Sequence, residues 1–296
     1  MNVGLIGAGI MGQPMARNLA RAGHELFVHS RRRSRVESLI DEGMAWCDSP
    51  AELAQTVDAI ISIVPDSPDV RAVYLGPGGV CETLRPGTLC IEMSTIDPAV
   101  AQEVGARVHK RGGKFLDAPV SGGKTGAEAG SLTIMVGGDE SDLCEAMPLL
   151  TAMGKNIVHC GPVGNGQLTK LCNQILCGVN LLAVCEAMVF ARKAGLDPAI
   201  MHKAVSTGAA GSWALQNLGQ RMLDRDFAPM FMIDLQQKDL GIALDQAREH
   251  GVPMPGTALV RELLGAAQAA GEGREGTQAL VKTLERLAAM LPNEPT

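Results

Sequence analysis

Hydrophobic and polar positions alternate along the first half of the chain in a way that predicts strands and helices in turn. Between the first two apolar runs, Met15, Leu19 and Ala22 recur at helical spacing, so a helix is expected from about Met11 to Ala22. The apolar runs, each ending in glycine, proline or polar residues, predict strands at 2–6, 25–29, 58–64, 89–93, 114–116, 133–136 and 157–159. This alternation predicts an α/β fold with a doubly wound parallel sheet.

From residue 165 onwards the pattern is helical. The stretch from Asn165 to Gly195 is apolar in every direction around a 3.6-residue period, which predicts one long helix buried on all sides. Polar residues interrupt it too often for a membrane span. Further helices are expected at 198–205, 213–224, 233–249, 258–270 and 278–291, followed by a frayed tail at 292–296. The glycine/proline break at 161–164 predicts two domains, a dinucleotide-binding domain at 1–163 and an all-α domain for substrate and oligomerisation at 164–296.

Composition excludes several classes of partner. The chain has 296 residues, 46% hydrophobic content and a net charge of −6, and its one basic run, 31–35, is too short for a nucleic-acid surface. Its eight cysteines form no CxxC pair and no Cys/His cluster at zinc spacing, so neither a metal site nor a disulfide framework is expected. The start of the chain does not resemble a signal peptide. We therefore expect a cytoplasmic protein with no nucleic-acid or membrane partner.

A glycine-rich turn separates the first predicted strand from the first predicted helix. Gly7 permits a tight turn, Gly9 lets the backbone approach a pyrophosphate, and Gly12 lets helix and strand pack closely. The start of the helix then faces the phosphates, with Ile10 and Met11 in the turn. These residues predict a Rossmann-type domain with a dinucleotide at Gly7, Gly9, Ile10, Met11 and Gly12. A glycine-rich turn with no ligand is the alternative.

The end of the second predicted strand indicates which dinucleotide binds. A site that selects NAD usually carries Asp or Glu there to bind the ribose 2′-hydroxyl, whereas this chain has Ser30 followed by Arg31. A guanidinium pairs with a 2′-phosphate by charge-assisted hydrogen bonds. The sequence therefore favours NADP at Ser30 and Arg31, while NAD remains possible if the arginines form a solvated loop.

Other strand ends also supply candidate binding residues. Parallel sheets of this kind bind ligands at the carboxyl ends of their strands, where Val64, Pro65 and Thr95 are expected. After a later strand, the backbone N–H groups of Gly122 and Gly123 and the Ser121 hydroxyl could hold a substrate carboxylate. A plain turn is the alternative there.

One ionisable group, Lys170, lies near the start of the predicted long helix. Gln167 precedes it by three residues, and Asn173 and Gln174 follow it by three and four. At this spacing the four side chains share one helical face, an arrangement suited to a polar substrate. The alternative is that Lys170 extends into water and has no catalytic function.

Several stretches together resemble the β-hydroxyacid dehydrogenase family, which includes 3-hydroxyisobutyrate dehydrogenase and tartronate semialdehyde reductase. They keep their order and spacing over essentially the whole chain. The stretches are 4–19, 93–95, 117–123, Gly166-Gln167 with Lys170 and Asn173, and 238–240.

The resemblance implies roles for individual residues. Lys170 is implied to be the catalytic lysine, Thr95 a contact on the nicotinamide side, and Lys238 a cofactor contact from the helical domain. The loop implied to hold the substrate carboxylate is Ser121, Gly122 and Gly123. Many members carry asparagine four residues after the lysine, where this chain has Gln174 after Asn173, so which amide binds substrate stays open. This amide pair and Val64-Pro65-Asp66 are similar to the tartronate semialdehyde reductase pattern.

The implied activity is hydride transfer between NADP(H) and a small 3-hydroxyacid or semialdehyde. Lys170 would give a proton to the developing alkoxide, and no metal is required. Reduction of tartronate semialdehyde to glycerate is the leading reaction. The alternatives are a 3-hydroxyisobutyrate dehydrogenase, a glyoxylate or succinic semialdehyde reductase and, more remotely, a dinucleotide-binding protein without catalysis. One small helical domain can hardly cover a helix that is apolar on all sides, so a homodimer or homotetramer is expected.

Overall fold

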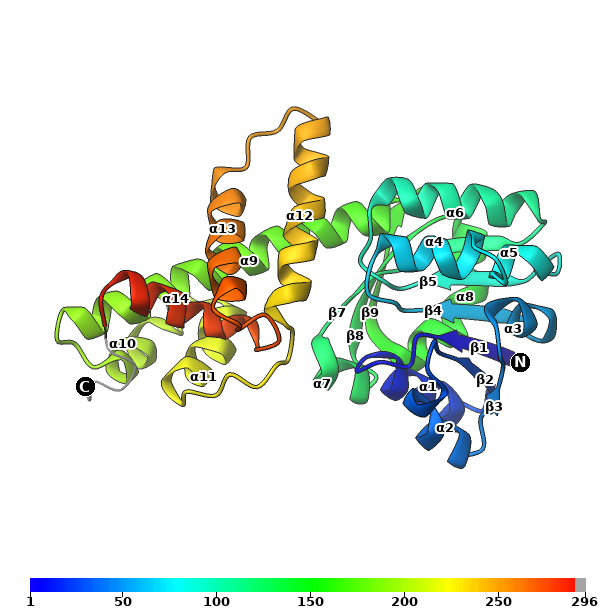
Figure 1. Cartoon of the computed structure of the whole chain (residues 1–296), viewed down its shortest axis with the longest axis horizontal. Coiled ribbons are helices and arrows are strands. Elements are labelled where there is room, and N and C mark those ends of the chain that lie inside the picture. Colours follow the sequence, from blue (N-terminus) through cyan, green and yellow to red (C-terminus); the bar gives the residue numbers. More distant parts are fainter. Residues whose placement is uncertain (291–296) are drawn as a thin grey trace. The chain divides into compact units, whose positions relative to one another are not determined.

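The computed structural model describes residues 1–290. The chain forms two compact units, Met1–Lys170 and residues 171–296 (Figure 1). Helix α9 (Asn165–Lys193) begins in the first unit and continues into the second. The predicted domain boundary at 163/164 therefore falls just before α9, and the division by contacts falls inside it. The predicted tail at 292–296 lies outside the described residues. The last predicted helix, expected to reach Leu291, ends at Leu287 instead.

The first unit is built on one mixed sheet of nine strands. The strands are β1 (Asn2–Ile6), β2 (Glu25–His29), β3 (Ala45–Trp46), β4 (Ala59–Ser62), β5 (Leu89–Glu92), β6 (Lys114–Asp117), β7 (Val120–Ser121), β8 (Leu132–Gly137) and β9 (Gly154–Gly161). Their order is β3-β2-β1-β4-β5-β6-β8-β7, with β9 beside β8. The sheet is parallel from β3 to β6, where Val3 lies opposite both Leu26 and Ala59.

The predicted doubly wound fold is confirmed, with one difference at the sheet edge: β8 runs antiparallel to β6. The sheet packs against two separate hydrophobic clusters, and helices α1 and α6 lie on opposite sides of it (Figure 1). One contains Met15 of α1 and Leu149 of α8, and the other contains Leu53 of α3 and Val104 of α6. The helices of this unit are α1 (Gly12–Arg21), α2 (Glu37–Asp41), α3 (Pro50–Thr56), α4 (Ser67–Leu75), α5 (Val80–Thr83), α6 (Pro98–Lys110), α7 (Gly123–Glu128) and α8 (Glu140–Met153).

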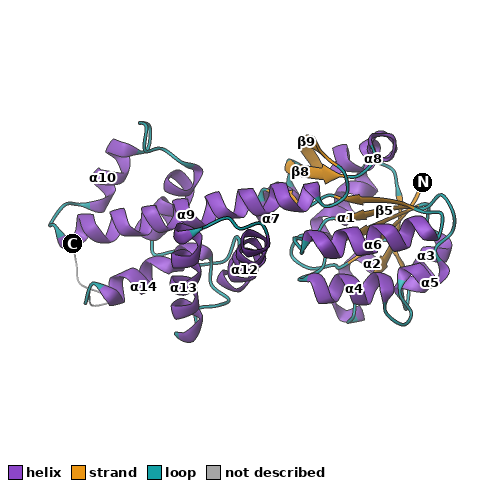
Figure 2. Cartoon of the chain, turned by 90° about the horizontal axis from the view of Figure 1, so that it is seen from above, coloured by secondary structure: helices purple, strands orange, loops and turns teal. Residues whose placement is uncertain are grey.

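In the second unit helices gather around α9 (Figure 2). They are α10 (Pro198–Val205), a π-helical segment (Ala214–Gly219), α11 (Gln220–Leu223), α12 (Ile233–Glu249), α13 (Pro255–Ala269), a 3-10 turn (Thr277–Ala279) and α14 (Leu280–Leu287). The bounds of α10 and α12 agree with the prediction. Helix α13 begins three residues earlier than predicted, because Pro255 is tolerated in a first helical turn.

The ends of α9 are capped differently. At its end Gly195 has φ +76°, and the N–H of Leu196 donates to the carbonyl of Ala191 at 2.9 Å, so a glycine ends the helix. At its start the side chain of Asn165 donates to the Cys160 carbonyl at 2.8 Å and does not cap the helix. Asp117 of β6 instead accepts the N–H of Gly164, just before the helix, and the N–H of Gln167 in its first turn.

The prediction that α9 is buried on all sides is wrong for the single chain. Leu181, Cys185 and Met188 are buried in the core of the second unit, but Leu176 is 64% and Phe190 74% exposed. One face of α9 packs on this core, and the opposite face is open in the described residues. Helix α9 is long and apolar enough to cross a membrane. This is weak evidence for a membrane span, because the core helices of soluble proteins can be equally long and apolar. Half of its most apolar stretch is buried.

Candidate functional site

In the glycine turn between β1 and α1, two glycines pack closely against backbone carbonyl groups. Gly7 follows β1 with φ +101°, and a side chain there would overlap the carbonyl oxygen of Ile63 at the end of β4. A side chain on Gly12 would in turn overlap the carbonyl oxygen of Gly7. These two glycines are therefore required by the fold itself.

Gly9 lies in a different environment from its two neighbours. Nothing would lie within 4 Å of a side-chain carbon placed on it, and both Gly9 and Ile10 are exposed. The turn lies between β1 and β4, where the strand order reverses, and α1 starts at Gly12 just after Met11. An open glycine backbone before a helix N-terminus at this place fits the pyrophosphate of a dinucleotide.

The end of β2 carries Ser30 and Arg31. Ser30 is half-buried, and the Arg31 guanidinium pairs with Asp69 of α4 at 3.0 Å while remaining 79% exposed. An ion pair this exposed contributes about 0–1 kcal/mol, so Arg31 can exchange Asp69 for another anion at little cost. No carboxylate occupies the position after β2 itself.

The ends of β4 and β5 are joined by a hydrogen bond between their loops. The N–H of Val64 donates to the Ser94 hydroxyl at 2.8 Å, which places the Val64-Pro65 segment beside the segment that leads to Thr95. Thr95 is half-buried and Pro65 is exposed. The structure thus brings these three predicted cofactor residues to one edge of the sheet.

A buried polar network lies beneath that edge, and sequence reasoning missed it. Glu92, the last residue of β5, is fully buried; it accepts a hydrogen bond from the Ser62 hydroxyl and another from the N–H of Ser94 at 2.7 Å. Ser62 also lies 2.8 Å from the Tyr74 hydroxyl. Burial raises the pKa of Glu92 to about 7, although the hydrogen bonds from Ser62 and Ser94 act in the opposite direction. The signal in the sequence was a carboxylate at the end of an otherwise apolar strand.

A second buried carboxylate holds the start of α9. Asp117 accepts the N–H of Gly164 at 2.7 Å and the N–H of Gln167 at 2.9 Å. Burial raises its pKa to about 6, while the backbone N–H groups lower it. Residue 166 must be glycine, because the first carbon of any side chain there would lie only 2.6 Å from the carbonyl oxygen of Asp117. Sequence reasoning assigned Asp117 only to the resemblance.

The first two turns of α9 carry Gln167 and Lys170. The fully buried Gln167 side chain accepts the N–H of Ile96 at 3.0 Å and donates to the Ser94 carbonyl at 2.8 Å. Lys170 follows one turn later and is 6% exposed, so the alternative that it extends into water is wrong. Within the first unit, the helix that carries Lys170 is therefore bonded directly to the segment around Thr95.

The predicted carboxylate loop follows β7. Ser121 ends the strand, Gly122 has φ +130° and Gly123, with φ +59°, begins α7. These backbone angles are strained for other residues, so the loop requires glycine at both positions. Its role as an anion-binding nest stays a prediction.

In the second unit, three predicted site residues, Asn173, Gln174 and Lys238, are connected through Asp239 by polar contacts. The Asn173 amide donates to the side-chain oxygen of Gln174 at 2.8 Å, and the Gln174 amide donates to Asp239 at 2.6 Å. Lys238 pairs with Asp239 at 3.0 Å. Gln174 is buried and Asn173 is half-buried. Both ends of the Gln174 side chain are therefore engaged.

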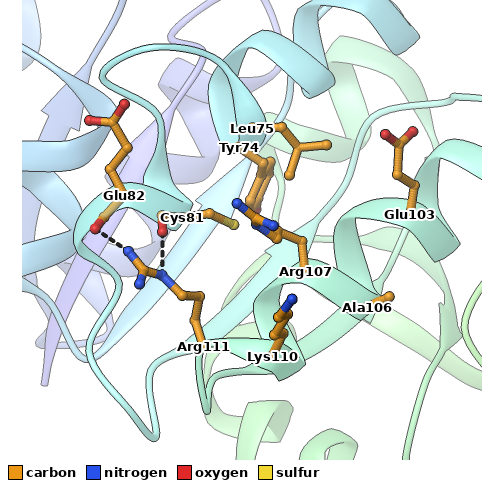
Figure 3. A pocket seen from close by; sticks show the side chains of 9 residues that line it. All are labelled: Tyr74, Leu75, Cys81, Glu82, Glu103, Ala106, Arg107, Lys110 and Arg111. Atoms are coloured by element: carbon orange, nitrogen blue, oxygen red, sulfur yellow. Dashed lines mark hydrogen bonds between the residues drawn. The ribbon is translucent and has the colours of Figure 1, made fainter.

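An open pocket of about 660 Å³ lies on α4, α5 and α6, away from every predicted site residue (Figure 3). Arg111 donates there to the backbone carbonyls of Cys81 and Glu82, and so ties α6 to α5. The pocket is lined mainly by exposed charged side chains and does not contain the chemistry that the sequence predicts. In residues 1–290 no three His, Cys, Asp or Glu side chains are grouped to hold a metal, and the expected absence of a metal stays a prediction.

Comparison with known proteins identifies relatives along the whole chain. Residues 2–161 match the family model described as the NAD binding domain of 6-phosphogluconate dehydrogenase. Residues 164–284 match the model described as NAD-binding of NADP-dependent 3-hydroxyisobutyrate dehydrogenase. The 2-hydroxy-3-oxopropionate reductase of Escherichia coli is 41% identical over 288 residues, which are 97% of this chain and 98% of the relative.

Two further relatives are named as 3-hydroxyisobutyrate dehydrogenases or as similar to them. The probable 3-hydroxyisobutyrate dehydrogenase-like 1, mitochondrial, of Arabidopsis thaliana is 41% identical over 96% of this chain and 85% of its own length. The solved structure of Mycobacterium tuberculosis 3-hydroxyisobutyrate dehydrogenase with L-serine is 34% identical, with a TM-score of 0.88. That similarity covers 96% of this chain and 98% of the other.

Proposed function

Because the chain belongs to the β-hydroxyacid dehydrogenase family, and is thus an NAD(P)-dependent oxidoreductase that acts on CH–OH groups, we propose that it reduces tartronate semialdehyde to glycerate. Tartronate semialdehyde is 2-hydroxy-3-oxopropionate, the compound that names the E. coli relative. The segments Val64-Pro65-Asp66 and Asn173-Gln174, which resemble those of tartronate semialdehyde reductases, support the same substrate.

Lys170 is the proposed general acid, and its burial at the start of α9 is the observation that carries the proposal. The bound dinucleotide supplies the hydride that reduces the carbonyl carbon. The Lys170 ammonium gives a proton to the oxygen as negative charge develops there, and the neutral amine takes it back in the oxidation direction. A buried lysine keeps this proton transfer away from competing water.

The substrate is held by two groups in this proposal. The N–H groups of Gly122 and Gly123, with the Ser121 hydroxyl, bind the carboxylate. Asn173, rather than Gln174, orients the hydroxyl or carbonyl oxygen, because both ends of the Gln174 side chain are already bonded within the second unit. Gln174 then supports Asn173 and fixes Asp239.

The cofactor is proposed to be NADP(H) in preference to NAD(H). Gly7, Gly9, Ile10, Met11 and Gly12 bind the pyrophosphate, and Arg31 leaves Asp69 to bind the 2′-phosphate beside Ser30. Val64, Pro65 and Thr95 are proposed to contact the cofactor, with Thr95 on the nicotinamide side. Lys238 is proposed as a cofactor contact from the helical domain.

We propose that residues 1–163 form the dinucleotide domain and that residues 164–296 form the domain for substrate and oligomerisation. The exposed apolar face of α9, with Leu176 and Phe190, supports a homodimer or homotetramer in which a second copy covers it. The eight cysteines are all free thiols, which is typical of a reducing compartment and supports a cytoplasmic location.

Oxidation of 3-hydroxyisobutyrate is the second candidate reaction. It is favoured by the model matched at 164–284 and by the similarity to the M. tuberculosis structure. The chemistry at Lys170 is the same for both substrates, so a direct comparison of substrates is needed.

The deciding experiment compares wild type, Lys170→Ala and the control Lys155→Ala, which removes an exposed lysine from the same unit. NADPH oxidation is followed with tartronate semialdehyde, and NADP⁺ reduction with 3-hydroxyisobutyrate. We expect rapid oxidation of NADPH by wild type and by the control, and a loss of about 10² or more in Lys170→Ala. If wild type is active only on 3-hydroxyisobutyrate, that compound replaces tartronate semialdehyde as the proposed substrate. A fast Lys170→Ala enzyme would refute the proposed proton donor.

A further inference from the structure

The side-chain amide of Gln167 binds the backbone on both sides of Thr95. Its oxygen accepts the N–H of Ile96, and its nitrogen donates to the carbonyl of Ser94. The amide cannot be turned over, because its NH₂ group would then face an N–H and its oxygen a carbonyl. One glutamine thus fixes both peptide groups that flank Thr95.

The other groups of this clamp are held from several directions. Ser94 donates its N–H to Glu92 and accepts the Val64 N–H with its hydroxyl, so the segment before Thr95 is fixed independently of Gln167. The N–H of Gln167 itself is bound by Asp117. The clamp therefore connects the ends of β4, β5 and β6 to the first turn of α9.

Lys170 is one helical turn beyond Gln167, a rise of about 4.5 Å along the helix axis. Because the intervening backbone is regular helix, the position of the Lys170 backbone is set by the same turn that holds Thr95. We propose that Gln167 is a positioning residue, whose amide fixes the Thr95 segment against the turn of α9 that carries Lys170. This inference rests on the proposed function, in which Lys170 supplies the proton and Thr95 lies on the nicotinamide side.

A positioning role has a different consequence from a purely structural one. Loss of the amide lets the Thr95 segment and the helix shift against each other, and a displacement of about 1 Å in such a frame can lower turnover by about 10²-fold. Binding of the adenosine and phosphate portions does not depend on this contact. The turnover number should therefore fall while the affinity for NADPH stays nearly constant.

The second unit provides a matched control in Gln278. It is also fully buried, and its amide nitrogen donates to the carbonyls of Asp226 and Ala228 at 2.9 and 3.2 Å. Gln278→Met removes the same type of side chain and the same type of hydrogen bond. It should lower the melting temperature without affecting the chemistry.

The experiment compares full-length wild type, Gln167→Met, Gln278→Met and Lys170→Ala. It measures kcat and KM with the substrate that wild type uses, the NADPH dissociation constant by fluorescence, and amide exchange at Ile96 without substrate. In Gln167→Met we expect kcat to fall by about 10- to 100-fold, KM and the NADPH dissociation constant to stay within about threefold, and exchange at Ile96 to accelerate. In Gln278→Met we expect kcat within about twofold of wild type.

Two results would overturn the inference: equal kcat values in Gln167→Met and Gln278→Met, or unchanged exchange at Ile96 in Gln167→Met. Failure of the proposed function would look different. It would appear as a fast Lys170→Ala enzyme or an inert wild type, and the Ile96 exchange rate would still decide whether the clamp exists.

Discussion

The side-chain amide of Gln174 donates a hydrogen bond to the carboxylate of Asp239 at 2.6 Å, and both side chains are buried. This contact separates Gln174 from its neighbour Asn173, which is only half-buried. We therefore expect Gln174 to support the helical domain, and Asn173 remains the proposed contact to the substrate.

Substitution of Gln174 should therefore mainly lower stability, and substitution of Asn173 should mainly lower activity. Gln174→Ala removes a donor from a buried carboxylate and should lower the free energy of unfolding by about 2–3 kcal/mol. Asn173→Ala should change stability by about 1 kcal/mol and lower kcat/KM by about 10-fold or more. Urea unfolding and steady-state kinetics measure both. If Gln174→Ala is as stable as wild type but loses more activity than Asn173→Ala, Gln174 rather than Asn173 contacts the substrate.

Glu92 should make the protein less stable at high pH. Its folded pKa, about 7, lies above the usual 4.5, so the folded state binds the proton more tightly than the unfolded state. Its contribution is fully present below about pH 4.5 and is lost as pH rises through 7, by about 3 kcal/mol at most. In Glu92→Gln the amide can donate to Ser62 and accept from Ser94, so the hydrogen bonds remain.

We therefore expect Glu92→Gln to equal wild type near pH 5 and to exceed its unfolding free energy by about 2–3 kcal/mol near pH 8. Urea unfolding at the two pH values measures the difference. Glu25→Gln, at an exposed position, is the control and should show no such trend. A constant difference between Glu92→Gln and wild type across this pH range would contradict the assigned titration.

Alanine at two glycines of the same turn should separate folding from binding. Gly12→Ala would push a methyl group into the Gly7 carbonyl and should lower stability by about 1–3 kcal/mol or more. Gly9→Ala has open space around it and should keep stability within about 0.5 kcal/mol. Because its methyl group fills the space proposed for the pyrophosphate, NADPH affinity should fall by about 10-fold or more. Fluorescence titration checks this, and unchanged affinity in Gly9→Ala would place the pyrophosphate elsewhere.

Arg31 should determine the preference for NADP over NAD. Arg31→Ala should raise the NADPH dissociation constant by about 10- to 100-fold, the value of one charge-assisted contact, and leave that of NADH within about twofold. Asp69→Asn frees the guanidinium and should leave NADPH binding equal or tighter. Fluorescence titrations with both dinucleotides at low salt measure these effects. Equal losses for NADPH and NADH would argue against a 2′-phosphate contact.

The open face of α9 should mediate association between copies of the chain. Charges introduced by the double substitution Leu176→Lys and Phe190→Lys should dissociate the oligomer, because both side chains are exposed in the single chain. Val158→Lys, at an exposed apolar position on β9, is the control. Light scattering at micromolar concentration measures the mass, and a wild type that is already monomeric would refute the oligomer.

Local pattern predicted much of the fold. The strand runs and the glycine turn are readable because each depends on neighbouring residues, and the bounds of α10 and α12 follow from their caps and periodicity. The direction of β8 was not predicted, since strand direction depends on the path of the connection and has no local marker. The open face of α9 was missed because periodicity counts apolar residues but does not say what covers them.

The sequence indicated which residues to propose for the candidate site, and their roles stay predictions, but it did not indicate how those residues are connected. Lys170, Thr95 and Asn173 were recognisable from residue type and motif. The clamp was not, because Gln167 bonds to Ile96 from 71 residues away and Asp117 to Gln167 from 50 residues away. Such pairings exist only after the sheet has formed.

The interlocked glycine turn has a consequence for how quickly a ligand is captured. Gly7 is wedged against Ile63, and Gly12 against Gly7, so the loop has little freedom to lose when a ligand arrives. The entropy of ordering this segment has already been lost during folding. Association with the phosphate portion should then proceed in a single kinetic phase, without a slow rearrangement of the loop.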